Sequence, residues 1–241
     1  MRTVDIIQTN EVGFMEVTLI QSQAAVDTSV LAALRSVIEG RRSIGKVHPE
    51  QPPREMIETI LEAATWAPNH RLTEPWRFFV LAGDARNELG RFMGNQNAER
   101  YPEGDPNRDI ERARGAKKAL RAPVVIGVAV EPVAAANVDP LEEIEAVACA
   151  VQNMLLTAHA LGLGAKWSSG SITQSTEVKT WFSLSERGQV LGFIYIGYPA
   201  MISERSVRTP SSGLTQWRGW DDALSVDPSA LTQVDRPKSL D

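Results

Sequence analysis

Cysteine is the scarcest residue in this sequence, and its scarcity limits the chemistry that the chain can perform. The single Cys149 cannot form an internal disulfide, so folding does not depend on oxidation. It lies in the apolar run 146–151, with no basic residue close to it in the sequence. This context favours a small buried side chain over a reactive nucleophile.

Long hydrophobic runs and blocks of basic residues are also missing. No stretch of about 18 apolar residues occurs that could span a membrane. Residues 1–20 lack the apolar core of a signal peptide, so we expect a cytoplasmic protein. The net charge is -5 and the basic residues are scattered, which leaves no electrostatic footprint for nucleic-acid binding.

The motifs of common catalytic centres are absent as well. The sequence contains no G-x-S-x-G, no HExxH and no P-loop. Gly162-Leu163-Gly164 follows a predicted helix rather than a strand, so it does not meet the context of a dinucleotide-binding fingerprint. The three histidines, His48, His70 and His159, are too dispersed to predict a metal site.

What is present fits one sizeable domain of 241 residues with 43% hydrophobic content. Apolar periodicity predicts alternating helices and strands, and hence an α/β or α+β sandwich. The predicted helices cover 30–40, 54–67, 85–94, 108–120, 141–162 and 175–184, and the predicted strands cover 76–81, 123–130, 165–167 and 190–197. We expect an N-terminal extension over 1–27, the domain over 28–210 and a C-terminal arm over 211–241.

Two segments leave alternatives open. The predicted helix 141–162 has a large apolar stripe and a second stripe of small residues, which could pack on the core or on another subunit. The polar segment 94–121 is typical either of a lid or binding segment or of a variable surface helix.

A first cluster of chemically useful residues, Arg41-Arg42-Ser43, directly follows the predicted helix 30–40. A guanidinium fork grips phosphate oxygens in pairs, and a serine hydroxyl can add a further hydrogen bond. The simpler alternative is that these cations only complement the negative end of the helix dipole.

Two further clusters lie at the ends of predicted strands. Residues 67–78 join a helix to a strand through a loop rich in hydrogen-bonding groups, and His70 by itself would be an ordinary surface residue there. Residues 164–170 run from a strand into small residues, which let backbone N–H groups approach a flat ligand closely.

Together with the segment 191–199, these three clusters resemble the nitroreductase family over roughly residues 30–210 and in the right order. The resemblance implies an α+β three-layer sandwich, in which helices flank a central mixed, mainly antiparallel sheet. It also implies a domain-swapped homodimer that binds FMN at the interface between its subunits.

The resemblance assigns phosphate recognition to the first cluster and the C-terminal part of the chain. Arg41 and Ser43, together with Arg42, would hold the FMN phosphate and ribityl chain. Arg208 lies where some family members supply a further phosphate-binding cation.

The other two clusters would surround the flavin. His70 and Glu74 would reach the FMN that is held mainly by the other subunit. Trp167, Ser168 and Ser169 would place backbone groups beside the flavin ring.

Three positions depart from the family pattern and make the expected site less cationic than in some members. Close relatives often have Gln at the position of Glu74. Some have Arg at the position of Ser168, and some have Lys two residues after the serine, where this chain has Gly45.

The activity that the resemblance implies is an FMN-dependent oxidoreductase with NAD(P)H as electron donor. The acceptor, a nitroaromatic, a quinone or a similar molecule, would replace the nicotinamide in the same slot, which gives ping-pong kinetics. FMN would carry this chemistry, so no protein nucleophile is needed. Two alternatives stay open: a related enzyme of another reaction type, such as a dehydrogenase or a dehalogenase, and a non-catalytic FMN-binding protein.

Overall fold

The structure, a computed structural model, describes residues 27–133, 137–201, 203 and 207–219. Two units are distinguished, residues 1–36 and 37–241, and helix α1 (Thr28–Gly40) crosses from one to the other. The predicted extension before Asp27 and the predicted arm beyond residue 219 lie outside the described residues. Among the residues that are described, no helix is long and apolar enough to cross a membrane.

Helix α1 begins and ends where the sequence predicts. The Asp27 carboxylate accepts the backbone N–H groups of Ser29 at 2.9 Å and Val30 at 3.3 Å, which satisfies free donors of the first turn. Apolar residues lie on one face of the helix, yet none of its residues is buried. Leu31 and Leu34 are 54% and 52% exposed.

A four-stranded antiparallel sheet forms the centre of the unit 37–241. Its strand order is β1-β2-β4-β3, and β2 lies between two neighbours and is buried along its whole length, as predicted for a central strand. A single parallel bridge joins Ser43 to Ala165 at the edge. The strands are β1 (Trp76–Ala82), β2 (Val124–Val130), β3 (Gly164–Ser168) and β4 (Gln189–Gly197).

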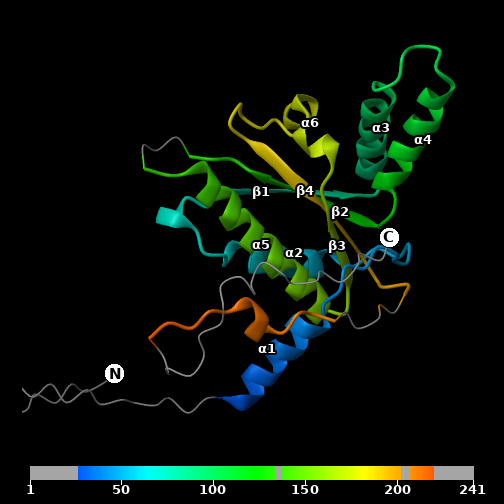
Figure 1. The fold of residues 1–241 in the computed structure, drawn as a ribbon. Helices are drawn as coiled ribbons and strands as arrows, with labels where there is room; N and C mark the ends of the chain where they lie inside the picture. The colour runs from blue at the N-terminus through cyan, green and yellow to red at the C-terminus, as the bar shows by residue number, and fades with distance from the viewer. Residues whose placement is uncertain (1–26, 134–136, 202, 204–206, 220–241) are drawn as a thin grey trace, which may run out of the picture. The chain divides into compact units, whose positions relative to one another are not determined.

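Helices cover both faces of this sheet, which gives the predicted three-layer α+β sandwich (Figure 1). Side chains of β2 alternate between the layers: Val124 and Ile126 join one core cluster, and Val125 and Ala129 join the other. The first cluster is completed by α2 (Arg54–Thr65) and α5 (Pro140–Ala160), and the second by α3 (Ala85–Ala98), α4 (Pro106–Ala119) and α6 (Thr176–Trp181).

The two stripes of α5 are covered to different extents within one chain: Asn153 and Thr157 of the small-residue stripe are half-buried and Ala160 is exposed. The large apolar stripe packs in the core cluster with the sheet, and the small-residue stripe faces α2, where Asn153 donates to the carbonyl of Ala63 at 3.1 Å. The large apolar stripe is therefore covered without a second subunit. The prediction that Cys149 is buried is wrong: it is exposed, because the sheet and α2 cover only part of the helix circumference.

The polar segment 94–121 contains the last turn of α3, the loop that follows it and helix α4. The backbones of α3 and α4 nearly touch in this hairpin. A Cβ atom added at Gly94 would lie 2.6 Å from the carbonyl oxygen of Arg112, and one added at Gly115 would lie 2.5 Å from that of Met93. Glycine at these positions therefore permits the close crossing of the two helices. Because α4 carries Lys118 near its end, this crossing also positions a charge that is discussed below.

The Gly115→Ala substitution tests this crossing. Alanine favours a helix over glycine by about 1 kcal/mol, but forcing a methyl group into the contact costs about 1–3 kcal/mol. We expect a net loss of stability, measured by urea unfolding. The control is Lys117→Ala, which changes an exposed residue of the same helix and should leave stability nearly unchanged. A gain of stability in Gly115→Ala would contradict the close crossing.

Candidate functional site

The first predicted cluster lies directly beside the third. Gly40 ends α1 against α5, where an added Cβ atom would come within 2.7 Å of His159 Nε2. The chain then continues along the sheet edge, where the backbone N–H of Ile44 donates to the carbonyl of Ala165 at 3.0 Å and Ser43 bridges to Ala165. Tertiary pairing thus brings Arg41-Arg42-Ser43 alongside strand β3.

The two arginines of the first cluster play different parts. The Arg42 guanidinium donates to the carbonyls of Glu39 at 2.7 Å and Arg41 at 2.8 Å. It therefore caps the C-terminal end of α1, which was the simpler of the two interpretations. Arg42 also lines a cavity of about 330 Å³ together with His159 and Pro199.

Arg41 instead belongs to a group of like charges. Burial lowers the pKa of the Arg41 guanidinium, and the nearby charges of Arg42 and Arg208 lower it further. An arginine stays protonated even so, because its ordinary pKa lies far above neutrality. These three residues, the arginine cluster, place positive charge where a dianionic phosphate would be stabilised. Arg208, assigned from the family resemblance, is thereby brought close to Arg41.

The third cluster depends on a close approach between two strands. A Cβ atom at Gly192 of β4 would lie 2.3 Å from the indole Nε1 of Trp167, so only glycine lets the indole lie in this position. Trp167 is 37% exposed, Ser168 is half-buried and Ser169 is exposed. The end of β3 therefore offers an accessible edge next to the pairing of Ser43 with Ala165.

The loop that carries His70 and Glu74 is fixed to the other end of α5. His70 Nδ1 lies 2.6 Å from Glu142 Oε2, and the Thr73 hydroxyl donates to the buried Glu143 carboxylate at 2.5 Å. Arg71, Leu72 and Glu74 all have positive φ angles of 56°, 54° and 47°. Three non-glycine residues in this region store backbone strain, which clusters at functional loops.

Helix α5 separates this loop from the arginine cluster within one chain (Figure 1). Glu142 lies in its first turn and His159 in its last, and the helix is continuous between them. At a rise of 1.5 Å per residue the two ends are about 25 Å apart. The structure therefore does not bring His70 and Glu74 together with Arg41 and Ser43 in the same chain.

A second group of cations, which sequence reasoning missed, lies around the end of β3. Burial lowers the pKa of Lys118, and the charges of Arg121, Lys166 and Arg100 lower it further. We call these four residues the lysine cluster. Lys166 was visible in the sequence as the one charged residue of a predicted strand, whereas Lys118 could not be told from its charged neighbours in a polar helix.

Tyr195 lies beside the lysine cluster. It is directly opposite Lys166 in the β3–β4 register, so the two side chains share a face of the sheet. Burial raises the pKa of Tyr195 to about 12, and its hydroxyl is therefore neutral at ordinary pH. Among the described residues this buried hydroxyl has no hydrogen-bond partner.

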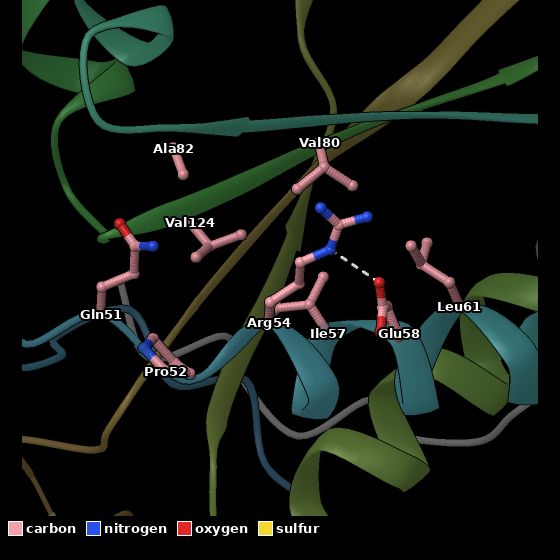
Figure 2. Close-up of a pocket in the computed structure, with 9 residues that line it drawn as sticks. All are labelled: Gln51, Pro52, Arg54, Ile57, Glu58, Leu61, Val80, Ala82 and Val124. Carbon is pink, nitrogen blue, oxygen red and sulfur yellow. Dashed lines mark hydrogen bonds and ion pairs between the residues drawn. The ribbon is translucent and has the colours of Figure 1, made fainter.

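A separate cavity of about 320 Å³ opens between α2 and the sheet (Figure 2). Ile57, Leu61 and Val80 make its wall apolar. Arg54 and Glu58, which form an ion pair of 2.7 Å, lie on one side of it. None of the predicted site residues lines this cavity, so we do not place the candidate site there.

The tether of the His70 loop can be tested by Thr73→Val. This change removes the Thr73 hydroxyl as a donor to the buried Glu143 carboxylate, which keeps the Val133 N–H as a donor at 3.3 Å. The loss of the hydroxyl donor should lower the free energy of unfolding by about 1–3 kcal/mol. Amide exchange in residues 69–74 should become faster. Thr59→Val removes a similar hydroxyl from the exposed face of α2 and is the control. Equal exchange in both variants would show that Glu143 does not hold the loop.

Comparisons with known proteins agree with this architecture. The family model described as "Nitroreductase family" matches residues 38–198. YdjA of Escherichia coli strain K12 is 32% identical over 170 residues, which cover 70% of this chain and 90% of YdjA. YfhC of Bacillus subtilis strain 168 is 33% identical over 181 residues, which cover 74% of this chain and 91% of YfhC. Both relatives bear the name of an NAD(P)H nitroreductase.

Solved structures show the same fold. A nitroreductase-like protein from Bacillus cereus superposes with a TM-score of 0.67 at 25% identity, over 78% of this chain and 96% of that one. A structure from Desulfovibrio desulfuricans, named as a nitroreductase in complex with FMN, gives a TM-score of 0.61 at 28% identity, over 78% and 98% of the two chains. The chain belongs to the nitroreductase family.

Proposed function

We propose that this protein is an FMN-dependent oxidoreductase that takes electrons from NAD(P)H and works as a homodimer. The observation that carries the proposal is the arginine cluster beside Ser43, held against the accessible end of β3. The names of the relatives YdjA and YfhC support NAD(P)H as the donor, and the Desulfovibrio desulfuricans structure supports FMN.

The residues present fit FMN by the chemistry of their donor groups. Two guanidinium groups and a hydroxyl match a phosphate dianion, since charged donors make the strongest hydrogen bonds to phosphate oxygens. Arg41, Arg208 and Ser43 would hold the phosphate and the ribityl chain, while Arg42 keeps the end of α1 in place. Backbone groups of Trp167, Ser168 and Ser169 would lie beside the ring.

A second copy of the chain would complete each site. His70 is held at Glu142, and Gly40, next to Arg41, is held at His159; these two positions of α5 are about 25 Å apart by the rise along the helix. A two-fold dimer can bring the loop of one protomer to the arginine cluster of its partner, because such an interface is self-complementary. Trp66 and Leu72, each 80% accessible, offer apolar surface for that contact.

The reaction follows from what the site would bind. When bound, FMN supplies the hydride and electron transfer, and the protein binds and orients the reactants. NAD(P)H and then a nitroaromatic, quinone or similar acceptor would occupy the same place in turn, which gives ping-pong kinetics. Glu74, in the strained loop, would bring a carboxylate to the partner's site where close relatives often have glutamine.

Replacement of Arg41 tests the cofactor assignment. Arg41→Ala should weaken FMN binding by about 2–4 kcal/mol, because a charge-assisted phosphate contact is lost. Titration of apoprotein with FMN, followed by flavin fluorescence, measures the change. Arg54→Ala removes the same charge from the exposed start of α2 and should bind FMN as the unchanged protein does. Equal affinity in both variants would assign Arg41 to the helix end alone.

Complementation between chains tests the shared site. Arg41→Ala chains and chains with both His70→Ala and Glu74→Ala should each lose high-affinity FMN binding and NAD(P)H oxidation. Random mixing of the two at equal amounts leaves one unaltered site in every mixed dimer, so about one quarter of all sites should recover. No recovery, or a monomer in light scattering, would refute the shared site.

A further inference from the structure

Lys166 holds its ammonium group beside the segment that follows Ser43. A Cβ atom placed on Gly45 would lie 3.5 Å from Lys166 Cδ and 3.8 Å from Lys166 Nζ. Gly45 comes two residues after Ser43, and Lys166 comes one residue after Ala165, to which Ser43 is bridged. The Lys166 charge therefore lies next to the backbone that the proposed function places along FMN.

This charge is part of a group of cations for which the described part of the chain shows no acidic partner. Lys118, half-buried at the end of α4, lies close to the loop after β3, where an added Cβ atom on Gly170 would be 3.7 Å from its ammonium. Among the described residues, none of Lys118, Lys166 and Arg121 pairs with a carboxylate, and the charges that act on Lys118 are all positive. A protein that holds like charges together without acids is suited to an anionic ligand.

Tyr195 gives a second, independent sign of a ligand on this face. The residue is 6% exposed, its side chain shares the sheet face with Lys166, and its hydroxyl has no partner among the described residues. Buried polar atoms in native proteins almost always have a partner, which can be an ordered water or a ligand. A neutral donor next to the lysine cluster suits an anionic or electron-rich group.

Arg41 begins the short segment 41–45, and Lys166 of the lysine cluster lies beside Gly45 at its other end. Four residues span at most about 14 Å of extended chain, so the clusters can act on one ligand of moderate size. FMN has two matching ends: a phosphate dianion and, beyond the ribityl chain, an electron-rich ring. Uptake of a hydride from NAD(P)H, which leaves as NAD(P)⁺, adds two electrons and one proton and so gives the ring one negative charge.

We propose that Lys166, with Lys118 behind it, is a cofactor-binding residue that stabilises the reduced FMN ring. This inference rests on the proposed function. Some members of the family have Lys at the position of Gly45 or Arg at that of Ser168, and this chain has neither. Lys166 supplies the missing charge from the neighbouring strand, into the space beside Gly45. The charge of Lys166 thereby compensates for the cations that some family members have at the positions of Gly45 and Ser168.

The decisive experiment compares the affinities of oxidised and reduced FMN in Lys166→Gln. The change should weaken binding of reduced FMN about tenfold more than binding of oxidised FMN, because only the reduced ring carries the extra charge. For a two-electron couple, a tenfold difference lowers the midpoint potential of the bound cofactor by about 30 mV. Anaerobic potentiometric titration measures this shift without turnover, and circular dichroism confirms that the variant is folded.

Lys46→Gln is the matched control, because it removes the same charge from an exposed residue next to Gly45. Its potential should equal that of the unchanged protein. Rescue provides the second arm: Gly45→Lys in the Lys166→Gln background should restore the potential. Within the described residues, an added Cβ atom at Gly45 meets only the Lys166 side chain, which the background shortens, so the new ammonium can enter the same space.

The outcomes separate this inference from the proposed function. If the unchanged protein binds FMN but Lys166→Gln keeps its potential, the inference fails and the proposed function stands. An unchanged potential with a raised KM for an acidic acceptor would assign the lysine cluster to substrate instead and would also overturn it. If the unchanged protein does not bind FMN, the proposed function itself fails.

Discussion

The pairing of segment 43–48 with the sheet edge is the contact on which the candidate site depends. The backbone of this segment bonds to β3 through Ile44 and Ala165, and to the chain after β4 through His48 and Tyr198. Two glycines make the approach possible. A Cβ atom at Gly164 would lie 2.8 Å from Ile44 Cγ2, and one at Gly197 would lie 2.9 Å from Val47 Cγ2. Larger residues there would push away the segment that carries Ser43 and follows Arg41.

Helix α5 has the complementary role of a spacer. Its buried stripes anchor it to the sheet and to α2, while its ends hold two different groups of residues. Glu142 and Glu143 at the first turn fix the strained loop with His70 and Glu74, and His159 at the last turn meets Gly40. Because a helix cannot shorten, a site that needs both groups has to be assembled from two chains.

The cationic residues around β3 have different environments. Arg42 satisfies carbonyl groups at the end of α1, whereas Arg41 is part-buried and lies near the charges of Arg42 and Arg208, which suits the phosphate-binding role that we propose. Lys118 and Lys166 lie together on the other side of Ser43, again without a carboxylate partner among the described residues. The positive charges within each cluster repel one another, and a bound anion would reduce this repulsion.

Local patterns in the sequence were enough to predict the helices and strands and an α/β or α+β sandwich, whereas the three-layer α+β arrangement followed from the family resemblance. Periodicity reports which face of an element is apolar, and this is a local property that folding preserves. It correctly indicated β2 as the central strand and Gly40 as the end of α1. The motif around Arg41, His70 and Trp167 led to the family by resemblance, and the comparisons confirm that family.

Contacts between distant segments were decided only by the tertiary structure. Periodicity could not tell that the exposed side of α5 would include Cys149, because that depends on how far the sheet and α2 reach around the helix. Nor could it show that Arg42 caps a helix while Arg41 does not, or that Lys118 and Lys166 meet across 48 residues of sequence. The sequence by itself determined the elements and the family, whereas packing determined which charges face one another, since electrostatic interactions depend on distance in space and not along the chain.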